Sequence, residues 1–309
     1  MSGYWKSRPR IILLIGLLIV CLLIAVAAML VLPREAGMLR TILFQPRSGC
    51  TFAEALEGGR SALHLGKRQT ELLQASRIIE RDTAGYVLWH TPRGDFWAPE
   101  GDTSWFYVLA ELELHPYGEE GPDSLRGAVV LDCGAHLGTY TRQALAAGAG
   151  LVVAIEPGPQ QVYCLRRTFA REIAAGRVRV EPRGVWNQEG ELTLHTSAAT
   201  DMDSILGPDT GSSEKILVTT VDRLVSDLHL SSVDLIKMDI ENAEPQALSG
   251  ASQTLKKFKP RLEIASYHTF DEYRRISETV LRANPGYRST NVGCRVDLGY
   301  SVPLTLMFY

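Results

Sequence analysis

The chain has 309 residues, of which 45% are hydrophobic, and this composition is typical of a globular protein with a sizeable core. Its formal net charge of −3 argues against a nucleic-acid-binding protein, because such proteins usually carry a basic surface. The five cysteines are scattered and include no Cys-x-x-Cys pair. We therefore expect neither a zinc site nor a disulfide framework, and a reducing compartment is favoured for the globular part.

The first feature along the chain is a long apolar segment. Residues 1–10 are basic, and residues 11–32 then contain no charged side chain before Pro33. About 20 apolar residues are enough to cross the hydrocarbon layer as a helix, so we predict a single-pass transmembrane helix over residues 11–32. A cleaved signal peptide is the alternative, because residues 25–27 offer a small-x-small cleavage site, but the apolar run continues beyond that site.

The next region is predicted to form an accessory part of the protein. Residues 33–68 are interrupted by glycines and prolines and are predicted as a linker with at most one short helix. Residues 69–124 are predicted as a layer of helix and hairpin. Its expected elements are a helix over 69–80, β-rich runs over 86–90 and 95–98, and an amphipathic helix over 105–115.

From residue 125 to residue 309, short apolar runs alternate with helical patterns. The expected strands are 128–132, 151–155, 178–181, 233–238, 262–266 and 303–308, with further extended pieces at 191–195 and 216–221. The expected helices are 139–147, 160–173, 245–258 and 271–283. Short strands that alternate with helices indicate right-handed βαβ units. We therefore predict an α/β domain with a mostly parallel sheet and helices on both faces.

A glycine-containing turn follows the first of these strands. Asp132 ends the strand, and Gly134 and Gly138 lie in the turn. Glycines allow the backbone to approach a ligand closely, and open α/β sheets bind ligands at the carboxyl ends of their strands. The spacing differs from the G-x-G-x-x-G of dinucleotide-binding folds, and Asp132 would repel a pyrophosphate but suit a ligand with an ammonium group. A tight turn without a ligand is the alternative.

Acidic residues follow two further strands. Glu156 comes after the second strand, where an acid can accept hydrogen bonds from the hydroxyls of a ribose. Asp239, Glu241 and Glu244 follow the strand that ends near residue 238, and acids clustered at a strand end are costly unless they bind something. Alternatively, Glu156, Glu241 and Glu244 simply favour the start of the helix that follows each of them.

Three motifs occur in order between residues 127 and 268, namely L-D-C-G-A-H-L-G-T-Y-T, A-I-E-P and D-L-I-K-M-D-I-E-N-A-E, the last followed by L-S-G-A. In sequence and spacing this region resembles the FkbM family of methyltransferases. The resemblance implies a Rossmann-like class I methyltransferase fold, S-adenosylmethionine as the cosubstrate and, usually, O-methylation of a hydroxyl. By position, it implies that Asp132, Gly134 and Gly138 hold the methionine part of the cosubstrate and that Glu156 holds its ribose.

The same resemblance assigns Asp239, Glu241 and Glu244 to the family's acidic motif beside the substrate pocket. Two positions depart from the family pattern. His136 stands where asparagine is commoner, and Asn242 stands where the family usually has glycine. Asn242 is therefore expected to change either the backbone conformation next to the acidic motif or the substrate specificity there.

Methyl transfer from a sulfonium is an in-line displacement that needs no metal and depends mainly on orientation. A hydroxyl nucleophile also benefits from a general base, for which Asp239, Glu241 and His268 are the candidates in that order. His268 comes directly after the strand over 262–267. The alternative to a general base is a histidine whose ring is hydrogen-bonded to a local carbonyl. An N-methyltransferase on the same fold, or a catalytically inactive membrane-tethered scaffold, remains an alternative function.

The acceptor is expected to be a sugar, a glycan or a small molecule, with the accessory layer shaping its pocket. The aromatic residues of that layer are expected to fill a core rather than to stack on a sugar, and they are Trp89, Trp97, Trp105 and Phe106. Lysine and arginine are balanced on the two sides of residues 11–32, so the positive-inside rule gives no orientation. Because a sulfonium cosubstrate is made in the cytosol, the catalytic domain is expected on the cytoplasmic side of the membrane.

Overall fold

The computed structural model describes residues 15–20, 33–114, 116–117, 121, 123–196, 204–206, 212–296 and 299–309. Apart from residues 15–20, the predicted transmembrane segment 11–32 lies outside the described residues. Among the residues that are described, no helix has the length and the apolar character needed to cross a membrane. The transmembrane helix therefore stays a prediction.

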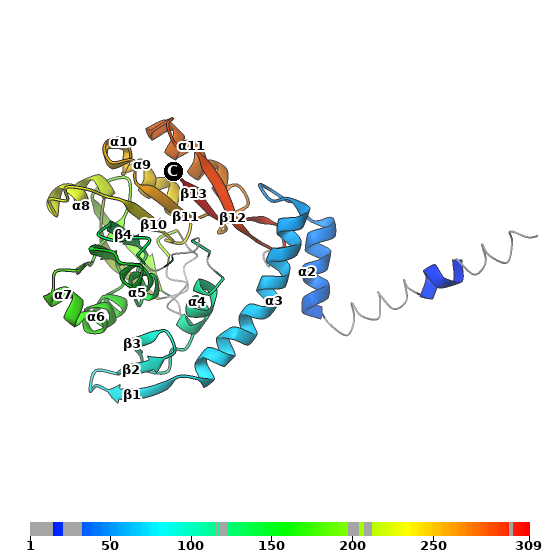
Figure 1. Cartoon of the computed structure of the whole chain (residues 1–309), viewed down its shortest axis with the longest axis horizontal. Coiled ribbons are helices and arrows are strands. Elements are labelled where there is room, and N and C mark those ends of the chain that lie inside the picture. The colour runs from blue at the N-terminus through cyan, green and yellow to red at the C-terminus, as the bar shows by residue number, and fades with distance from the viewer. Residues whose placement is uncertain are drawn as a thin grey trace, which may run out of the picture.

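The main domain is built on a seven-stranded sheet (Figure 1). In sheet order its strands are β12 (Ser289–Arg295), β13 (Val302–Phe308), β11 (Arg261–Ala265), β10 (Leu235–Met238), β4 (Val129–Cys133), β5 (Leu151–Ile155) and β6 (Val178–Glu181). The strands from β11 to β6 run parallel, whereas β13 runs antiparallel to β11 and β12 antiparallel to β13. The sheet is thus mixed, with the predicted parallel order in its centre and an antiparallel edge.

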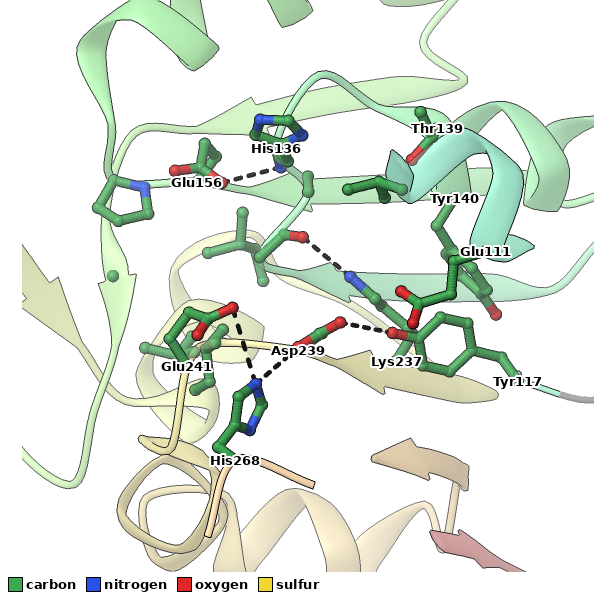
Figure 2. A pocket seen from close by; sticks show the side chains of 18 of the residues that line it. Glu111, Tyr117, His136, Thr139, Tyr140, Glu156, Lys237, Asp239, Glu241 and His268 are labelled. Atoms are coloured by element: carbon green, nitrogen blue, oxygen red, sulfur yellow. Dashed lines mark hydrogen bonds and ion pairs between the residues drawn. The ribbon is translucent and has the colours of Figure 1, made fainter. Parts of the chain in front are cut away.

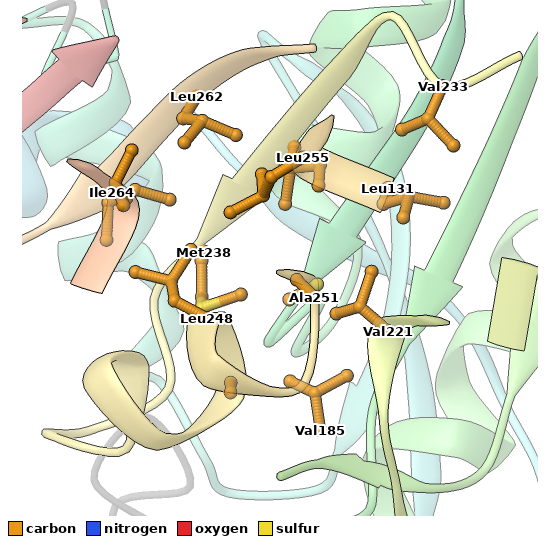
Figure 3. Packing of buried hydrophobic residues seen from close by; sticks show 14 of the residues in the cluster. Leu131, Val185, Val221, Val233, Met238, Leu248, Ala251, Leu255, Leu262 and Ile264 are labelled. Carbon is orange, nitrogen blue, oxygen red and sulfur yellow. The ribbon is translucent and has the colours of Figure 1, made fainter. Parts of the chain in front are cut away.

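Helices cover both faces of this sheet, as predicted. One face packs against α8 (Val221–Asp227), α9 (Glu244–Ser249), α10 (Ser252–Lys257) and α11 (Glu272–Ala283), and the other against α5 (Thr139–Ala146), α6 (Pro159–Thr168) and α7 (Ala170–Ala174). Successive side chains of a strand point to opposite faces, so Leu131 of β4 joins the first core and Val130 the second. Figure 3 shows the first core, where Leu131, Leu262 and Leu255 meet between the sheet and its helices.

The N-terminal part contains more helix than the sequence predicts. Helices α2 (Pro33–Phe44) and α3 (Phe52–Gln74) occupy most of residues 33–68, so the prediction of a linker there is wrong. Helix α3 starts at a capping box, in which the Thr51 hydroxyl accepts a hydrogen bond from Glu54 N and the Glu54 carboxylate accepts one from Thr51 N.

At two of the three glycines inside α3, a larger residue would collide with neighbouring elements. A Cβ at Gly58 would lie 1.9 Å from the carbonyl oxygen of Cys294, and a Cβ at Gly59 would lie 2.9 Å from Ile42 Cδ1. These glycines look like helix breakers in the sequence, but in the structure they allow α3 to pack closely against β12 and α2.

The accessory layer continues with β1 (Arg77–Arg81), β2 (Tyr86–Thr91) and β3 (Gly94–Pro99), which form an antiparallel sheet, and with α4 (Trp105–Leu112). The predicted hairpin and the helix after it are confirmed. The predicted helix over 69–80 is wrong beyond Gln74, because the chain there pairs with β2 as a strand. Trp97, Trp105 and Phe106 are buried in the core of this layer, as expected.

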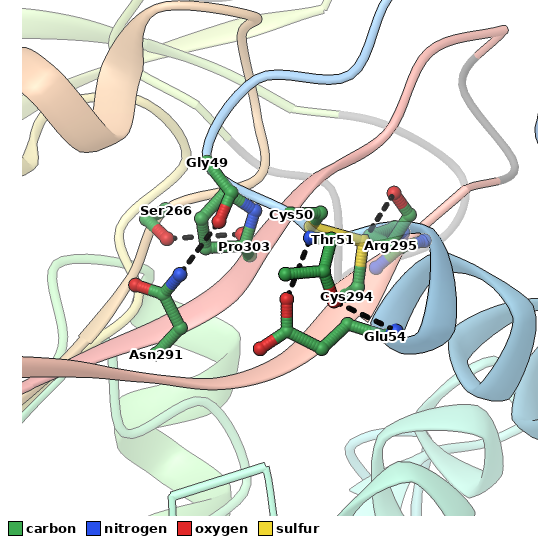
Figure 4. The surroundings of a disulfide bond; sticks show 9 residues. All are labelled: Gly49, Cys50, Thr51, Glu54, Ser266, Asn291, Cys294, Arg295 and Pro303. Carbon is green, nitrogen blue, oxygen red and sulfur yellow. Dashed lines mark hydrogen bonds between the residues drawn. A yellow bond between two sulfur atoms is a disulfide. The ribbon is translucent and has the colours of Figure 1, made fainter.

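A disulfide joins Cys50, just before α3, to Cys294 on β12 (Figure 4). No disulfide framework was expected from the sequence, which did not indicate this single bond. The two cysteines are 244 residues apart in the sequence, and the packing of α3 on β12 brings them together. No spacing pattern in the sequence could indicate such a pair. Cys133 and Cys164 are buried free thiols.

A third sheet has three strands, in the order β7 (Gly184–Val185), β9 (Ser213–Thr219) and β8 (Gly190–His195). Strands β8 and β9 match the extended pieces expected at 191–195 and 216–221, except that the chain turns into α8 at Val221. The Thr220 hydroxyl caps α8 by accepting a hydrogen bond from Arg223 N at 3.0 Å.

Glu263 on β11 of the seven-stranded sheet has a fully buried carboxyl group. Tyr140 OH donates a hydrogen bond to its Oε2 at 2.6 Å, and Arg261 Nη2 lies 2.8 Å from its Oε1. Burial raises the pKa of Glu263 to about 7, although the Arg261 guanidinium acts to lower it. At pH values between 4.5, the pKa of this group in the unfolded chain, and about 7, Glu263 stays protonated in the folded chain but is ionised in the unfolded chain.

The free energy of unfolding is therefore expected to fall as the pH rises through this window, because the unfolded chain binds fewer protons than the folded one. Glu263→Gln should remove about 3 kcal/mol of the stability difference between about pH 4 and about pH 8. Urea unfolding of the parent and the variant at both pH values measures this change. An equal pH dependence in the two proteins would contradict the assignment.

Candidate active site

A cavity of about 590 Å³ opens where β4, β5, β10 and β11 end (Figure 2). Its volume lies in the usual range for a small-molecule site, and its position is the edge at which open α/β sheets bind ligands. Loops after four strands form its floor, and α4, residues 116–117 and Arg295 of β12 complete its wall. The cavity brings Gly134, Glu156, Asp239, Glu241 and His268 together, as the sequence predicts.

The two predicted glycines are needed for close packing of the turn between β4 and α5. Both have left-handed backbone, with φ of +76° at Gly134 and +88° at Gly138. A Cβ at Gly134 would lie 1.9 Å from the carbonyl oxygen of Asp239, and one at Gly138 would lie 2.2 Å from the ring of Phe169. Gly134 lines the cavity, whereas Gly138 lies at the start of α5 and sets the direction of that helix.

Asp132 lies behind the cavity wall and is fully buried. Its Oδ2 accepts a hydrogen bond from the Thr141 hydroxyl at 2.6 Å, and its Oδ1 lies 3.2 Å from Lys237 Nζ. Lys237 in turn donates to the carbonyl oxygen of Gly134 at 2.9 Å and lines the cavity. Burial alone would lower the pKa of Lys237, but the carboxylate of Asp132 raises it above its usual value, so the ammonium stays charged.

Sequence reasoning missed Lys237, although a lysine within the apolar strand before Asp239 is a usable signal. A buried lysine needs a partner for its charge, and Asp132 provides one from the neighbouring strand. Asp132 therefore acts on the cavity by holding Lys237 and Thr141 rather than by facing a ligand itself.

Glu156 lies at the end of β5 and presents its carboxylate to the cavity. Its Oε2 accepts a hydrogen bond from His136 N at 2.8 Å (Figure 2), and its Oε1 accepts one from Gly158 N at 3.0 Å. These bonds fix the carboxylate between the loop after β4 and the loop after β5. It is thereby held in one orientation.

The opposite end of the cavity carries Asp239, Glu241 and His268. Asp239 Oδ1 lies 3.4 Å from His268 Nε2, and Glu241 Oε1 lies 3.7 Å from the same nitrogen. Tyr117 OH donates a hydrogen bond to Asp239 Oδ2 at 2.7 Å (Figure 2). The sequence did not indicate Tyr117, which comes from the segment after α4 and not from a strand end.

Glu241 and its neighbour Asn242 adopt left-handed backbone, with φ of 57° and 72°. Asparagine tolerates this conformation better than most residues, and glycine tolerates it best, which explains why either can stand at position 242. The Asn242 side chain also accepts a hydrogen bond from Arg275 Nη2 at 3.0 Å. Asn242, which stands where the family usually has glycine, therefore still allows the left-handed backbone at this position.

Glu244 begins α9 and does not line the cavity. It is fully buried, and its Oε1 accepts a hydrogen bond from Ile240 N at 2.7 Å. Burial raises the pKa of Glu244 well above its usual value. The hydrogen bond from Ile240 N ties Glu244 to the loop that carries Asp239 and Glu241.

His268 is surrounded by carboxyl groups on both sides of its ring. Its Nδ1 lies 3.2 Å from Glu272 Oε2 and 3.8 Å from Glu244 Oε1, while Nε2 faces Asp239 and Glu241. Burial alone would lower the pKa of His268, but the carboxyl groups, Glu244 first, raise it well above its usual value. The side chains of Asp239 and Glu241 are 20% and 32% exposed, against 8% for His268, so the two carboxylates are the better candidates for the general base.

The remaining wall of the cavity combines aromatic and charged side chains. Arg295 lies over the ring of Tyr267 at 4.4 Å, and its Nη1 lies 3.4 Å from Glu111 Oε1. Tyr107 of α4 lines the same wall. The sequence did not indicate Arg295, because this residue belongs to the polar strand β12, which the apolar pattern does not reveal.

Comparison with known proteins decides the family of this domain. The family model described as "Methyltransferase FkbM domain" matches residues 132–288, which is just over half of the chain. The chain belongs to the FkbM methyltransferase family. The matched FkbM domain contains the loops after β4, β5, β10 and β11, and therefore the strand-end residues that line the cavity.

Solved structures that match the chain include the FkbM methyltransferase of Methylobacillus flagellatus, with 20% identity and a TM-score of 0.43. The match covers 82% of this chain and 60% of that one, so the chain spans about three fifths of the length of that FkbM protein. Magnesium protoporphyrin IX methyltransferase of Synechocystis, solved with bound SAM, has 16% identity and a TM-score of 0.37, over 65% of this chain and 75% of that one. Curated protein sequences gave no match.

Proposed function

We propose that the chain uses S-adenosylmethionine to methylate a hydroxyl group. The observation that carries the proposal is the placement of two different carboxylate sites at opposite ends of one cavity. Glu156 follows β5, Asp239 and Glu241 follow β10, and the turn at Gly134 after β4 lies between them. The first end suits a nucleoside with an amino-acid part, and the second suits an acceptor that must lose a proton.

In this arrangement the ribose hydroxyls donate hydrogen bonds to Glu156, and the methionine part lies along the backbone at Gly134. Asp132 and Gly138 position that backbone from behind, Asp132 through Lys237 and Thr141. The charged ammonium of Lys237 at the cavity floor also suits the carboxylate of the methionine part.

The reaction is an in-line displacement at the methyl carbon. The acceptor oxygen forms a bond to that carbon while the carbon–sulfur bond breaks, and the electron pair goes to sulfur, which becomes a neutral thioether. The hydroxyl proton passes to a carboxylate at the acidic end, with Asp239 as the first candidate because it lines the cavity at the end of β10. The N-methyl alternative is distinguished by product analysis.

The acceptor is proposed to be a sugar, a glycan or a small molecule with a free hydroxyl. The wall of tyrosines and paired charges formed by Tyr107, Tyr267, Glu111 and Arg295 supports an acceptor with both polar groups and apolar faces. The predicted helix over residues 11–32 would hold the domain at a membrane. The Cys50–Cys294 disulfide favours an oxidising side of that membrane over the cytoplasmic side expected from the sequence.

Isothermal titration of the full-length chain in detergent with S-adenosylmethionine tests the cosubstrate assignment. We expect the parent to bind, and we expect Glu156→Ala to weaken binding by about 10- to 100-fold, because hydrogen bonds to a charged group contribute about 1.5–3 kcal/mol each. Glu181→Ala, a carboxylate at the end of the outer strand β6, is the control. Failure of a folded parent to bind would contradict the proposal.

A further inference from the structure

We propose that Asp239, Glu241 and His268 form a binding site for one divalent cation. The three side chains come from the ends of two neighbouring strands, β10 and β11, and meet at the acidic end of the cavity (Figure 2). Each offers one ligand atom, namely Asp239 Oδ1, Glu241 Oε1 and His268 Nε2, and these atoms all lie within 4.8 Å of one another.

Two of the three separations between these atoms match those of a metal site. Ligands that bind Zn²⁺ or Mn²⁺ at about 2.0–2.2 Å, with angles between octahedral and trigonal, lie about 3.0–3.7 Å from each other. His268 Nε2 lies 3.4 Å from Asp239 Oδ1 and 3.7 Å from Glu241 Oε1. These distances are longer than good hydrogen bonds, but a cation between the atoms can bind all three at once.

Two of the three ligand atoms, which lie 3.4 Å from each other, make no hydrogen bond in the part of the chain that the structure describes. His268 Nε2 and Asp239 Oδ1 are both buried without a hydrogen bond. The His268 side chain is 8% exposed, and its Nε2 points between the two carboxylates. A buried polar atom without a partner is costly and rare in folded proteins, and a bound cation would satisfy both atoms.

Neighbouring residues hold the ligands in the orientation that a metal site requires. A metal-binding histidine usually directs its second ring nitrogen at a carboxylate, and His268 Nδ1 lies 3.2 Å from Glu272 Oε2. Tyr117 OH binds the second oxygen of Asp239 and leaves Oδ1 free to face the site. The left-handed backbone at Glu241, unusual for a residue other than glycine, turns its side chain back toward His268.

The other side of the His268 ring is less suited to a cation. Glu244 and Glu272 lie near Nδ1, but both side chains are fully buried. Each also accepts a backbone hydrogen bond, Glu244 from Ile240 N and Glu272 from His268 N. The oxygens of Glu244 and Glu272 that face Nδ1 are therefore occupied, whereas Asp239 and Glu241 open into the cavity.

Two carboxylate oxygens and one imidazole nitrogen favour a cation of intermediate softness, such as Mn²⁺ or Zn²⁺, over Mg²⁺ or Ca²⁺. Three protein ligands also leave coordination positions open toward the cavity. If the proposed methyl transfer to a hydroxyl is correct, a cation there would bind the acceptor oxygen and lower the pKa of its hydroxyl. That role rests on the proposed function, whereas cation binding itself does not.

Titration of the full-length chain with Mn²⁺, followed by the electron paramagnetic resonance signal of the free ion, tests the site. We expect one bound Mn²⁺ per chain and at least about tenfold weaker binding in Glu241→Gln, because loss of a ligand should cost at least as much as loss of an outer partner. The Glu241 side chain is 32% exposed, so this change should leave the fold intact. His268→Gln should weaken binding similarly.

Glu111→Gln is the matched control, since it makes the same change of charge in the wall of the same cavity and should leave Mn²⁺ affinity unchanged within about twofold. Failure of the parent to bind Mn²⁺, equal binding by Glu241→Gln, or equal weakening by the control would each overturn the proposal. S-adenosylmethionine is titrated into the same samples without Mn²⁺. Cosubstrate binding without Mn²⁺ binding rejects the cation site alone, and the reverse result rejects the cosubstrate assignment alone.

Discussion

Replacing Asp239 by asparagine is expected to lower kcat by about 10²- to 10⁴-fold while S-adenosylmethionine still binds. Asparagine has the same shape and can still accept the hydrogen bond from Tyr117 OH, but it cannot take up a proton at the acidic end of the cavity. Turnover measured with and without saturating Mn²⁺, together with calorimetry of cosubstrate binding, gives both quantities.

The control for this variant is Asp234→Asn. Asp234 precedes the same strand, at the edge of the sheet away from the cavity, where its carboxylate accepts a hydrogen bond from Val129 N. This substitution should leave kcat unchanged. Full activity of Asp239→Asn would remove Asp239 from the chemistry, and loss of cosubstrate binding would assign it to the ligand pocket instead of to proton transfer.

Removal of the disulfide is expected to give the largest change in stability. Cys294→Ser should lower the free energy of unfolding by about 2–4 kcal/mol, because the bond closes a long loop and so restricts the unfolded chain. The expected fall in Tm is about 5–10 °C. Thermal unfolding with and without a reducing agent measures the change.

The reducing agent supplies the internal control for this prediction. It should lower the Tm of the parent to that of Cys294→Ser and leave the variant unchanged. Alkylation of free thiols in protein taken directly from cells shows whether the bond exists in the native compartment. A parent whose Tm does not respond to reduction, or whose Cys50 and Cys294 are alkylated in cells, would contradict a structural disulfide.

The position of the site could be predicted from the sequence because parallel strands end at one edge of their sheet. Glu156, Asp239 and His268 each follow a different buried strand, and the order β11-β10-β4-β5 brings all three to the same cavity. The apolar pattern of these strands does not depend on distant parts of the chain, so it can be recognised before the fold is known.

Features that depend on contacts between distant segments could not be predicted in this way. Gly58 reads as a helix breaker until Cys294 is known to lie beside it, and the disulfide at Cys294 has no local signature. The inward orientation of Asp132 depends on Lys237 of the neighbouring strand. Arg295 belongs to an edge strand whose residues are mostly polar, and such strands lack the apolar pattern that identifies buried ones.

The bond between Cys50 and Cys294 also makes most of the protein a covalent ring. The ring includes α3, the accessory layer and the strand ends that form the cavity, while residues before Cys50 lie outside it. A protease that cuts the backbone once between these cysteines would therefore leave two fragments still joined. Such a nicked protein would stay attached to the N-terminal segment, so a loop cut would not release a catalytic fragment from the membrane predicted to hold it.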